Sequence, residues 1–247
     1  MSTSVQWGVA RRRFFVDEIR GGTAELRGEE ARHLTRVLRV EAGQRYEISD
    51  GQHAWLAEIE EARGERVVFR AVEAIPYVAP RVRVTLCAAL TKFDRFEWMI
   101  EKATELGVER VLPFEATRTE KGLFEASRKR RERWERIARE SSQQSRRTRL
   151  PEIAEAVQFA AALKEAASHR YFLDEGEAPP LLREIPEERQ DMAAVMIGPE
   201  GGWSDAEREQ ARAAGWTAVS LGPLVLRAET AVCAALAVVQ NAWLGAA

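Results

Sequence analysis

The sequence of 247 residues has little of what marks exported, disulfide-bonded or membrane-spanning proteins. Its two cysteines, Cys87 and Cys233, each lie in an apolar stretch, which makes a disulfide framework improbable and indicates a reducing compartment. The longest apolar run, near Ala231–Val239, is too short to cross a bilayer. The first residues lack the apolar segment and cleavage site of an export signal. We therefore expect a cytoplasmic protein with no membrane partner.

Two common ligand motifs are also missing. No Gly-x-x-x-x-Gly-Lys-Ser/Thr stretch occurs, and no Gly-x-Gly-x-x-Gly follows an N-terminal strand, so an ATP or nicotinamide site is poorly supported. The histidines and cysteines form no cluster with metal-ligand spacing. The sequence therefore predicts no metal site.

The net charge of −2 conceals a basic segment in the middle of the chain. Between Arg118 and Leu150 there are twelve Arg or Lys against five Glu, an excess of seven positive charges. Such a segment fits a polyanionic partner, because neutralising phosphates releases counterions. The Glu–Arg spacing in "RKRRERWERIARE" fits a solvated helix equally well.

Strand and helix signals divide the chain in two. Residues 1–73 are typical of a small β-rich unit, with short strand-like runs separated by Gly-containing turns. Residues 74–82 contain two prolines and are the expected linker. Strands and helices alternate over residues 83–247, which predicts an α/β domain with a largely parallel sheet and helices on both faces.

Three helices carry specific signals. In the β-rich unit, residues 28–40 place four apolar side chains at helical spacing, namely Ala31, Leu34, Val37 and Leu38. In the second part, Asp94 is expected to cap a helix that Gly107 ends. Ser204 and Glu207 match a capping box, in which a hydroxyl and a carboxylate satisfy the first turn of the next helix.

The stretch "MIGPEGGWSDAE" places a buried strand directly before three glycines, which surround Pro199 and Glu200. The capping box accounts for the helix that follows but not for this loop. Glycines let the backbone approach a ligand closely and adopt positive φ, so three of them at the end of a strand indicate a ligand site. A tight turn is the simpler alternative.

A second loop lies in "SLGPLVLRAETAVCAAL". Its run Leu224–Leu226 is more apolar than a free surface loop requires, and together with exposed backbone groups it suits a flat heterocycle such as adenine. Arg227 ends the loop beside a helix N-terminus, where helix electrostatics favour anions. Arg227 could serve a ligand there, or it could form an ion pair with Glu229 or Glu200.

These two loops, together with "EKATELGVERVLPF", "ARESSQQSRRTRLPEI" and "EARHLTRVLRVEAGQ", carry a resemblance over almost the whole chain. The sequence resembles the RsmE family of ribosomal RNA methyltransferases, which are SPOUT enzymes. The resemblance implies a trefoil-knotted α/β domain preceded by a small PUA-like β-barrel, and a homodimer. It also implies methyl transfer from S-adenosylmethionine to N3 of a uridine in 16S rRNA, as naked rRNA or in the small ribosomal subunit.

By this resemblance the glycine loop and the apolar loop form two walls of a cofactor site, and the strand "YFLDE" contributes a third side. The implied cofactor-binding residues are Leu173, Gly198, Pro199, Glu200, Gly201, Gly202, Leu221, Gly222, Leu224, Val225, Leu226 and Thr230.

The implied reaction suggests three catalytic candidates. Uridine N3 carries a proton at neutral pH, so the reaction needs close approach, aligned geometry and a positive group near the uracil oxygens. Arg227 is the first candidate for that group, because its planar fork is permanently charged. Glu200 and Glu229 could orient Arg227 or accept a proton.

Candidate RNA-binding residues occur in both parts of the chain. Arginines beside aromatic residues and arginines at helical spacing fit phosphate contact and base stacking, and further basic residues follow the ends of strands. The set is Arg11, Arg12, Arg13, His33, Arg36, Arg39, Lys92, Arg118, Gln144, Arg146 and Arg147.

Two alternatives remain open. The same fold and cofactor could serve another RNA base or a ribose hydroxyl, and a non-catalytic RNA-binding protein would need only the barrel and the basic segment. The two loops and Arg227 favour the enzyme, because phosphate binding alone requires none of them.

Overall fold

The computed structural model describes residues 12–187 and 192–242, which form two compact units. The first unit comprises the chain up to Val78 together with Ser142–Leu150. The second comprises Ala79–Ser141 and the chain from Pro151 onward. A short segment from the middle of the chain therefore belongs to the N-terminal unit.

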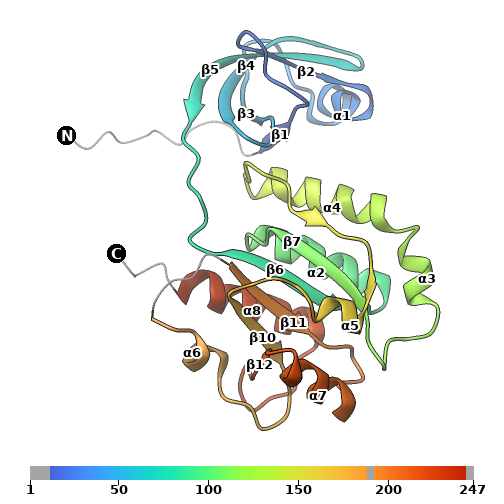
Figure 1. Cartoon of the computed structure of the whole chain (residues 1–247). Helices are drawn as coiled ribbons and strands as arrows, with labels where there is room; N and C mark the ends of the chain where they lie inside the picture. The colour runs from blue at the N-terminus through green and yellow to red at the C-terminus, as the bar shows by residue number, and fades with distance from the viewer. Residues whose placement is uncertain (1–11, 188–191, 243–247) are drawn as a thin grey trace. The chain divides into compact units, whose positions relative to one another are not determined.

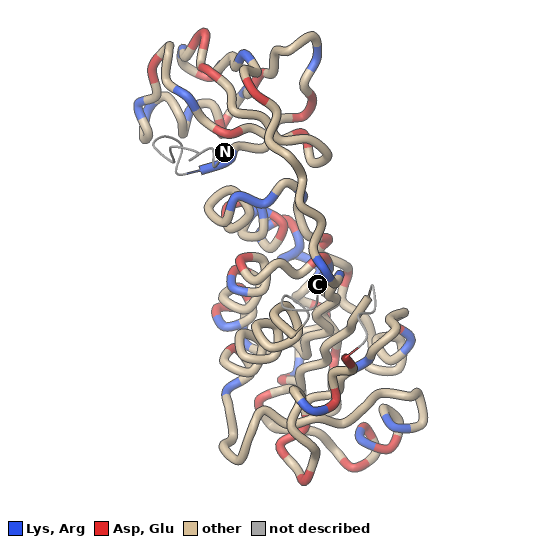
Figure 2. Tube along the Cα trace, turned by 90° about the vertical axis from the view of Figure 1, so that its left-hand side faces the viewer, with Lys and Arg blue, Asp and Glu red and all other residues tan. Residues whose placement is uncertain are grey.

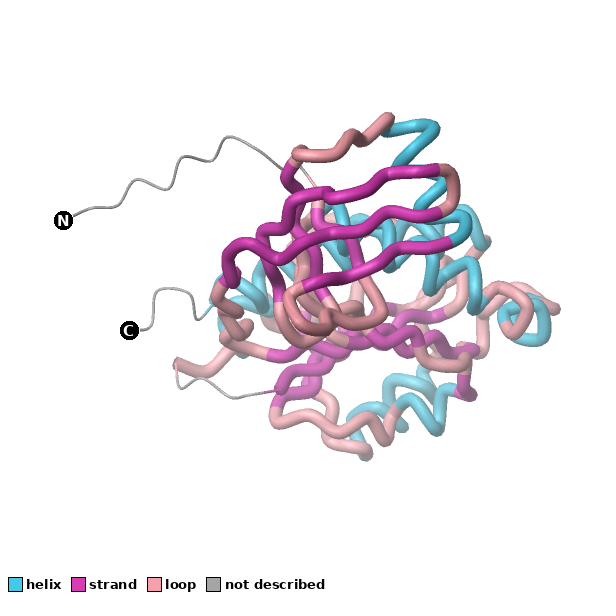
Figure 3. The backbone as a smooth tube through the Cα atoms, turned by 90° about the horizontal axis from the view of Figure 1, so that it is seen from above, coloured by secondary structure: helices cyan, strands magenta, loops and turns pink. Residues whose placement is uncertain are grey.

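The first unit is a curled five-stranded sheet, as its β-rich sequence predicts (Figures 1 and 3). Its strands are β1 (Arg13–Phe15), β2 (Thr23–Arg27), β3 (Arg45–Ser49), β4 (Ala54–Arg63) and β5 (Arg66–Ile75). Their order is β1-β3-β4-β5-β2, with β1 parallel to β3 and the other pairs antiparallel. Register shifts between β4 and β5 add local twist and bend this long hairpin.

The helix expected at residues 28–40 forms as α1 (Gly28–His33) followed by the π-helical η1 (Leu34–Leu38). Ala31 and Leu34 are fully buried in the core of the unit. The expectation that Val37 and Leu38 lie on the same face is wrong, because these side chains are 65% and 36% exposed. A π turn closes i→i+5 hydrogen bonds, so residues at the usual helical spacing no longer project to one side.

The second unit is built on a parallel sheet with the order β12-β10-β11-β6-β7-β8, and β9 pairs with β7. The strands are β6 (Arg83–Ala89), β7 (Arg110–Glu115), β8 (Glu152–Ile153), β9 (Val157–Gln158), β10 (His169–Leu173), β11 (Met192–Ile197) and β12 (Thr217–Val219). All of these strand pairs are parallel. The predicted α/β fold is confirmed.

Helices cover both faces of this sheet (Figure 1). They are α2 (Phe93–Glu105), α3 (Leu123–Ser127), α4 (Arg131–Gln144), α5 (Phe159–Ala162), α6 (Leu181–Glu184), α7 (Asp205–Ala213) and α8 (Ala228–Ala242). Side chains of α2, α4 and α8 form one core, and side chains of α5 and α7 form the other. Along β6, Leu86 and Ala88 belong to the first core while Cys87 and Ala89 belong to the second, so this strand is buried on both sides.

The capping box at the start of α7 is confirmed, with Ser204 and Glu207 each accepting a hydrogen bond from the other's backbone N–H. The cap predicted at Asp94 is wrong. Helix α2 begins at Phe93, Lys92 occupies the capping position, and no side chain caps it. Asp94 lies in the first turn instead, where the helix dipole favours its charge. Gly107 has a φ of 87° and ends α2 as expected.

Basic and acidic positions are interspersed along the chain (Figure 2). In the basic segment, Arg130 and Arg133 form ion pairs with Glu97, and Arg131 pairs with Glu135 and Glu155. The pair Arg131–Glu135 has the helical spacing that the solvated-helix interpretation expects, whereas the other pairs neutralise the segment through Glu97 of α2 and Glu155. Cys87 and Cys233 are free thiols. Across residues 12–187 and 192–242, no helix has the length and apolar character needed to cross a membrane.

Candidate active site

A cavity of about 270 Å³ opens where β10, β11 and β12 end. Because these strands run parallel, their last residues, Leu173, Ile197 and Val219, lie at one edge of the sheet. The predicted cofactor residues that line the cavity are Leu173, Gly198, Pro199, Glu200, Gly202, Leu221, Gly222, Leu224, Val225 and Leu226. Two further predicted residues, Gly201 and Thr230, are not part of its lining.

Gly198 is required by a buried tryptophan that the sequence interpretation overlooked. A Cβ added at Gly198 would lie 2.7 Å from Cε2 of Trp203, which is closer than real Cβ contacts come. Trp203 is held in place because its Nε1 donates a 2.7 Å hydrogen bond to the carbonyl of Leu173, and its ring stacks on Phe172 with centroids 4.3 Å apart. The glycine therefore lets the loop pass over the indole.

The other two glycines also meet protein atoms. A Cβ on Gly201 would lie 3.1 Å from Cβ of Arg118, and Gly202 has a φ of 70° beside the carboxylate of Glu175. Arg118 donates from Nη1 to the Gly201 carbonyl at 2.7 Å. Close approach is thus the reason for all three glycines, but the approaching groups include Trp203, Arg118 and Glu175 of the protein itself.

A second contact fastens the loop after β7 to the start of α7. The buried carboxylate of Glu207 accepts hydrogen bonds from the backbone N–H of Thr117 at 2.8 Å and from the N–H and hydroxyl of Ser204. Burial alone would raise the pKa of Glu207, but these hydrogen bonds outweigh it and hold the pKa below its ordinary value. Glu207 therefore stays charged at neutral pH and links the backbone of Thr117 to Ser204 at the start of α7.

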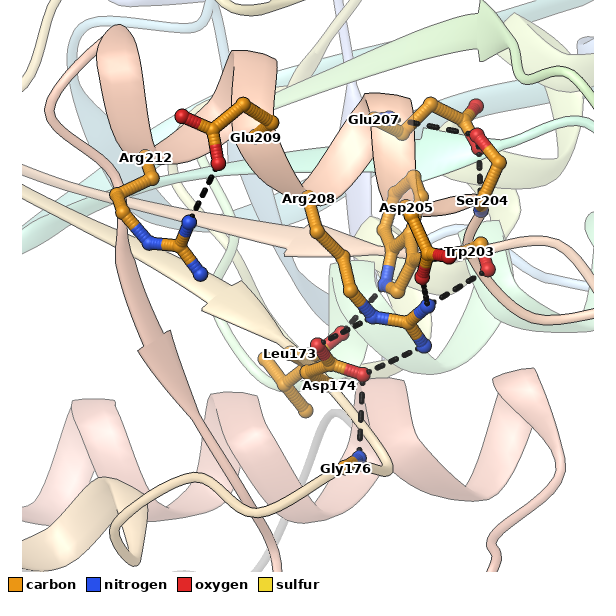
Figure 4. A network of polar contacts seen from close by, with 10 residues as sticks. All are labelled: Leu173, Asp174, Gly176, Trp203, Ser204, Asp205, Glu207, Arg208, Glu209 and Arg212. Carbon is orange, nitrogen blue, oxygen red and sulfur yellow. Dashed lines mark hydrogen bonds and ion pairs between the residues drawn. The ribbon is translucent and has the colours of Figure 1, made fainter.

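The floor of the site is stabilised by a bidentate ion pair (Figure 4). Arg208 of α7 donates from Nε and Nη2 to the two carboxylate oxygens of Asp174, at 2.8 and 3.1 Å. Its Nη1 donates to the carbonyl of Trp203 at 3.0 Å. Burial tends to raise the pKa of Asp174, but the hydrogen bonds from Arg208 and from the Gly176 N–H lower it below its ordinary value.

This pair predicts a pH-dependent stability. A carboxyl whose pKa is lowered on folding stabilises the protein above its unfolded pKa, and that contribution is lost as the pH falls through the folded pKa. Replacing Asp174 by asparagine should lower the free energy of unfolding at pH 7 by about 1–2 kcal/mol. The difference from wild type should begin to shrink below about pH 4, where the unfolded carboxyl takes up a proton, and should vanish only as the pH falls through the lower folded pKa.

The measurement is the thermal unfolding midpoint between pH 3 and pH 7. Asp205 is the matched control, because it also contacts Arg208 but its side chain is fully exposed. Asp205→Asn should behave as wild type throughout. A constant difference between Asp174→Asn and wild type over the whole pH range would contradict the assignment.

The apolar loop between β12 and α8 forms the outer wall. Leu224 and Val225 line the cavity and yet are 77% and 78% exposed. Within the described residues, no backbone N–H between Leu221 and Arg227 donates a hydrogen bond. The loop thus presents apolar side chains together with unpaired peptide groups, which is the combination that a flat heterocycle needs.

Five charged residues line the cavity, and three of them, Arg95, Glu200 and Arg227, decide whether the predicted ion pair forms. Arg227 lines the cavity and is exposed, and its guanidinium contacts no hydrogen-bonding or ion-pairing group among the described residues. Glu200 pairs instead with Arg95 of α2, which the sequence interpretation did not single out. The ion pair considered between Arg227 and Glu200 or Glu229 is therefore not formed.

The remaining candidates near this edge lie apart from the cavity. Glu229 is not in its lining, and its Oε2 is buried with no hydrogen-bond partner in the described part of the chain. Lys92 is exposed before α2, and Arg118 is exposed beside the glycine loop.

Most RNA-binding candidates of the first unit are at least partly exposed, but Arg13 is buried in contacts with other residues of the protein. Arg11 lies outside the described residues, while Arg12, His33, Arg36 and Arg39 are exposed. Gln144, Arg146 and Arg147 lie in the segment that joins this unit, with Gln144 exposed and the two arginines half-buried.

Arg13 does not fit the predicted RNA-binding role, because its side chain is used in contacts within the protein. Its side chain is buried, pairs with Glu47 at 2.9 Å and donates to the hydroxyl of Thr148 at 2.7 Å. Ser49 also donates to the Thr148 carbonyl. These contacts hold the segment Ser142–Leu150 against β1 and β3, and no short-range sequence signal could have revealed them.

Both units of the chain are similar to parts of known proteins. Residues 79–240 match the profile of the RNA methyltransferase domain, and residues 26–72 match that of the RNA methyltransferase PUA domain. Over 247 aligned residues the chain is 33% identical to ribosomal RNA small subunit methyltransferase E of Mycobacterium bovis, covering 92% of this chain and 90% of that protein. The protein of the same name from Bacillus subtilis is 28% identical, covering 88% and 90%.

Solved structures agree. Ribosomal RNA small subunit methyltransferase E from Neisseria gonorrhoeae, bound to S-adenosylmethionine, superposes with a TM-score of 0.86 at 29% identity, covering 94% of this chain and 98% of that one. A putative methyltransferase from Legionella pneumophila, in complex with the same cofactor, gives a TM-score of 0.84 at 29% identity, covering 93% and 96%.

Proposed function

Because the chain belongs to the ribosomal RNA small subunit methyltransferase E family, we propose that it methylates N3 of a uridine in small-subunit rRNA with S-adenosylmethionine. Its fold is the α/β fold of these SPOUT-type enzymes with their PUA domain. The observation that carries the proposal is the cavity at the sheet edge. It has an apolar wall, and its loop N–H groups and the Arg227 side chain have no partner among the described residues.

The cavity fits this cofactor in shape and charge. Leu224, Val225 and Leu226 would pack on the adenine, while the amides of the same loop would satisfy its ring nitrogens. The carboxylate of Glu175 lines the cavity and suits a ligand with an ammonium and a sulfonium group. We assign cofactor binding to these residues together with Leu173 and the glycine loop.

When bound, S-adenosylmethionine supplies a methyl group that the adjacent sulfonium makes electrophilic. Negative charge accumulates on the uracil oxygens as N3 loses its proton, and we assign Arg227 to stabilise it. Arg227 suits this task because it is permanently charged, exposed at the rim and unpaired among the described residues.

Glu200 is better suited to positioning than to proton removal. One of its oxygens already accepts from the Arg95 guanidinium, so the pair holds a second cation at the cavity rim. We therefore assign Glu200 the role of orienting Arg95 and leave Glu229 out of the site. The group that accepts the N3 proton then belongs to the RNA, to the solvent or to a second copy of the chain.

The partners follow from this assignment. We propose that the first unit binds rRNA through its exposed arginines and that the chain acts as a homodimer in the cytoplasm, where its substrate is made. The small subunit is the proposed target, either as naked 16S rRNA or after assembly.

The test is methyl transfer from labelled S-adenosylmethionine to unmodified small subunits and to naked 16S rRNA, followed by nucleoside mass spectrometry. Recovery of 3-methyluridine is the expected result. The substrate that is methylated faster shows whether the enzyme acts on naked 16S rRNA or on the assembled small subunit. Label on another base or on a ribose would show that the protein is a methyltransferase with a different acceptor atom in the RNA. No label from a folded, RNA-binding protein would leave only a non-catalytic RNA-binding role.

A further inference from the structure

Arg95 lines the cavity, but the proposed reaction gives it no ligand. It lies in the first turn of α2, and its side chain is 36% exposed. The other arginine among the residues that line the cavity, Arg227, is assigned to the uracil. No sequence motif singled out Arg95, and its place at the cavity follows from its contact with the glycine loop.

The guanidinium of Arg95 is held from one side only. Its Nη1 donates a hydrogen bond to Oε1 of Glu200 in the glycine loop, across 105 positions of the sequence. A guanidinium presents several N–H donors in a fixed plane, more than one carboxylate oxygen can use. No further hydrogen bond or ion pair of this side chain occurs within the described residues. Arg95 is therefore oriented by Glu200 and keeps free donors for a ligand in the cavity.

An unpaired carboxylate reaches the same part of the glycine loop. Oε1 of Glu175 lies 2.5 Å from the position that a Cβ on Gly202 would take, and Glu175 has no ion-pair partner in the described part of the chain. Glu200, which holds Arg95, precedes Gly202 by two residues, and such a step spans at most about 7 Å. A cationic and an anionic group of the cavity lining therefore reach the loop close to each other.

We propose that Arg95 binds the carboxylate of the methionine part of S-adenosylmethionine while Glu175 binds its ammonium group. The two charged groups of an amino acid are attached to one carbon, so their partners on the protein must also be close together. A guanidinium suits this carboxylate because it donates charge-assisted hydrogen bonds in a planar fork. Glu200 then acts as a positioning residue. The inference rests on the proposed function for the identity of the cofactor, and it adds the residue that recognises the amino-acid end.

A phosphate of the RNA fits Arg95 less well. Glu200 already balances the charge of Arg95, and Glu175 adds a second carboxylate at the same part of the loop. These three side chains together carry one net negative charge at neutral pH, which opposes a polyanion. S-adenosylmethionine has an ammonium, a sulfonium and a carboxylate, so its net charge is positive and it is attracted to this part of the cavity.

The test compares two ligands that differ only in this carboxylate. S-adenosylmethionine and decarboxylated S-adenosylmethionine are titrated calorimetrically into wild type and into Arg95→Ala. Wild type should bind the decarboxylated ligand about 10- to 100-fold more weakly, the size expected for hydrogen bonds between charged groups. Arg95→Ala should lose a similar factor in affinity for S-adenosylmethionine and should no longer distinguish the two ligands. Arg95→Lys keeps the charge but not the planar fork, so it should recover part of the discrimination.

Arg133→Ala is the matched control, because Arg133 also pairs with a glutamate, Glu97 of α2, but is not part of the cavity lining. It should discriminate between the two ligands as wild type does. An equal loss of affinity for both ligands in Arg95→Ala would overturn the assignment, since it would indicate a disturbed cavity and not a lost carboxylate contact.

The affinity for 16S rRNA tests the phosphate alternative. Unchanged cofactor affinity together with weaker RNA binding in Arg95→Ala would assign the arginine to a phosphate and overturn the inference. Wild type that discriminates between the two ligands but transfers no methyl group to rRNA would refute the proposed function and leave Arg95 at the cofactor carboxylate.

Discussion

Replacing Arg227 by alanine is expected to slow methyl transfer by about 100- to 1,000-fold, the loss seen when one group that stabilises a developing anion is removed. The affinity for S-adenosylmethionine should stay close to wild type, because the guanidinium is assigned to the uracil and not to the cofactor. Stability should also be unchanged, since Arg227 is exposed and its side chain has no partner in the described residues. Single-turnover transfer to rRNA and calorimetric titration with the cofactor measure the two effects separately.

Two further variants make this result specific. Arg227→Lys keeps the charge but loses the planar fork, so it should recover only part of the rate. Arg212→Ala removes another exposed arginine, one that pairs with Glu209 on α7 away from the cavity, and should transfer methyl groups as wild type. A loss of cofactor affinity as large as the loss of rate in Arg227→Ala would assign the arginine to the cofactor instead.

The fold could be predicted where the signals are local. Alternating strands and helices, the capping box of Ser204 and Glu207, and the positive φ of Gly107 each depend on residues a few positions apart. The predictions of helix boundaries and helix faces failed where no side chain determines the local backbone conformation. The capping position of α2 has no side-chain cap and lies two residues before the one proposed, and the π-helical turn at Leu34–Leu38 breaks the regular spacing.

The candidate site was predictable in position but not in its internal contacts. Glycines at the end of a strand indicated the cavity, yet the residues that require them are spread along the sequence. Arg118 reaches Gly201 across 83 positions, and Arg95 reaches Glu200 across 105. Trp203 was visible beside the glycines, but its bond to the Leu173 carbonyl depends on how β10 and β11 pair. A single sequence carries no signal for such pairings.

The contact between Gly198 and Trp203 gives the second large effect. Gly198→Ala is expected to destabilise the protein by about 1–3 kcal/mol, the usual cost of overpacking a core. The indole cannot move aside easily, because it is buried, hydrogen-bonded to Leu173 and stacked on Phe172. The glycine loop must move instead, which displaces one wall of the cavity. Cofactor affinity should therefore fall by about tenfold or more, each tenfold corresponding to about 1.4 kcal/mol.

A double-mutant cycle tests whether the tryptophan is the cause. Trp203→Phe removes ring atoms next to Gly198 and also loses the hydrogen bond to Leu173, so alone it should weaken both stability and cofactor binding. Because the smaller ring leaves room for a methyl group, adding Gly198→Ala to Trp203→Phe should cost much less than adding it to wild type. Gly176→Ala is the matched control, since its Cβ would make only an ordinary contact 3.6 Å from Asp174. Strict additivity of the two losses would show that the glycine is needed by the ligand rather than by Trp203.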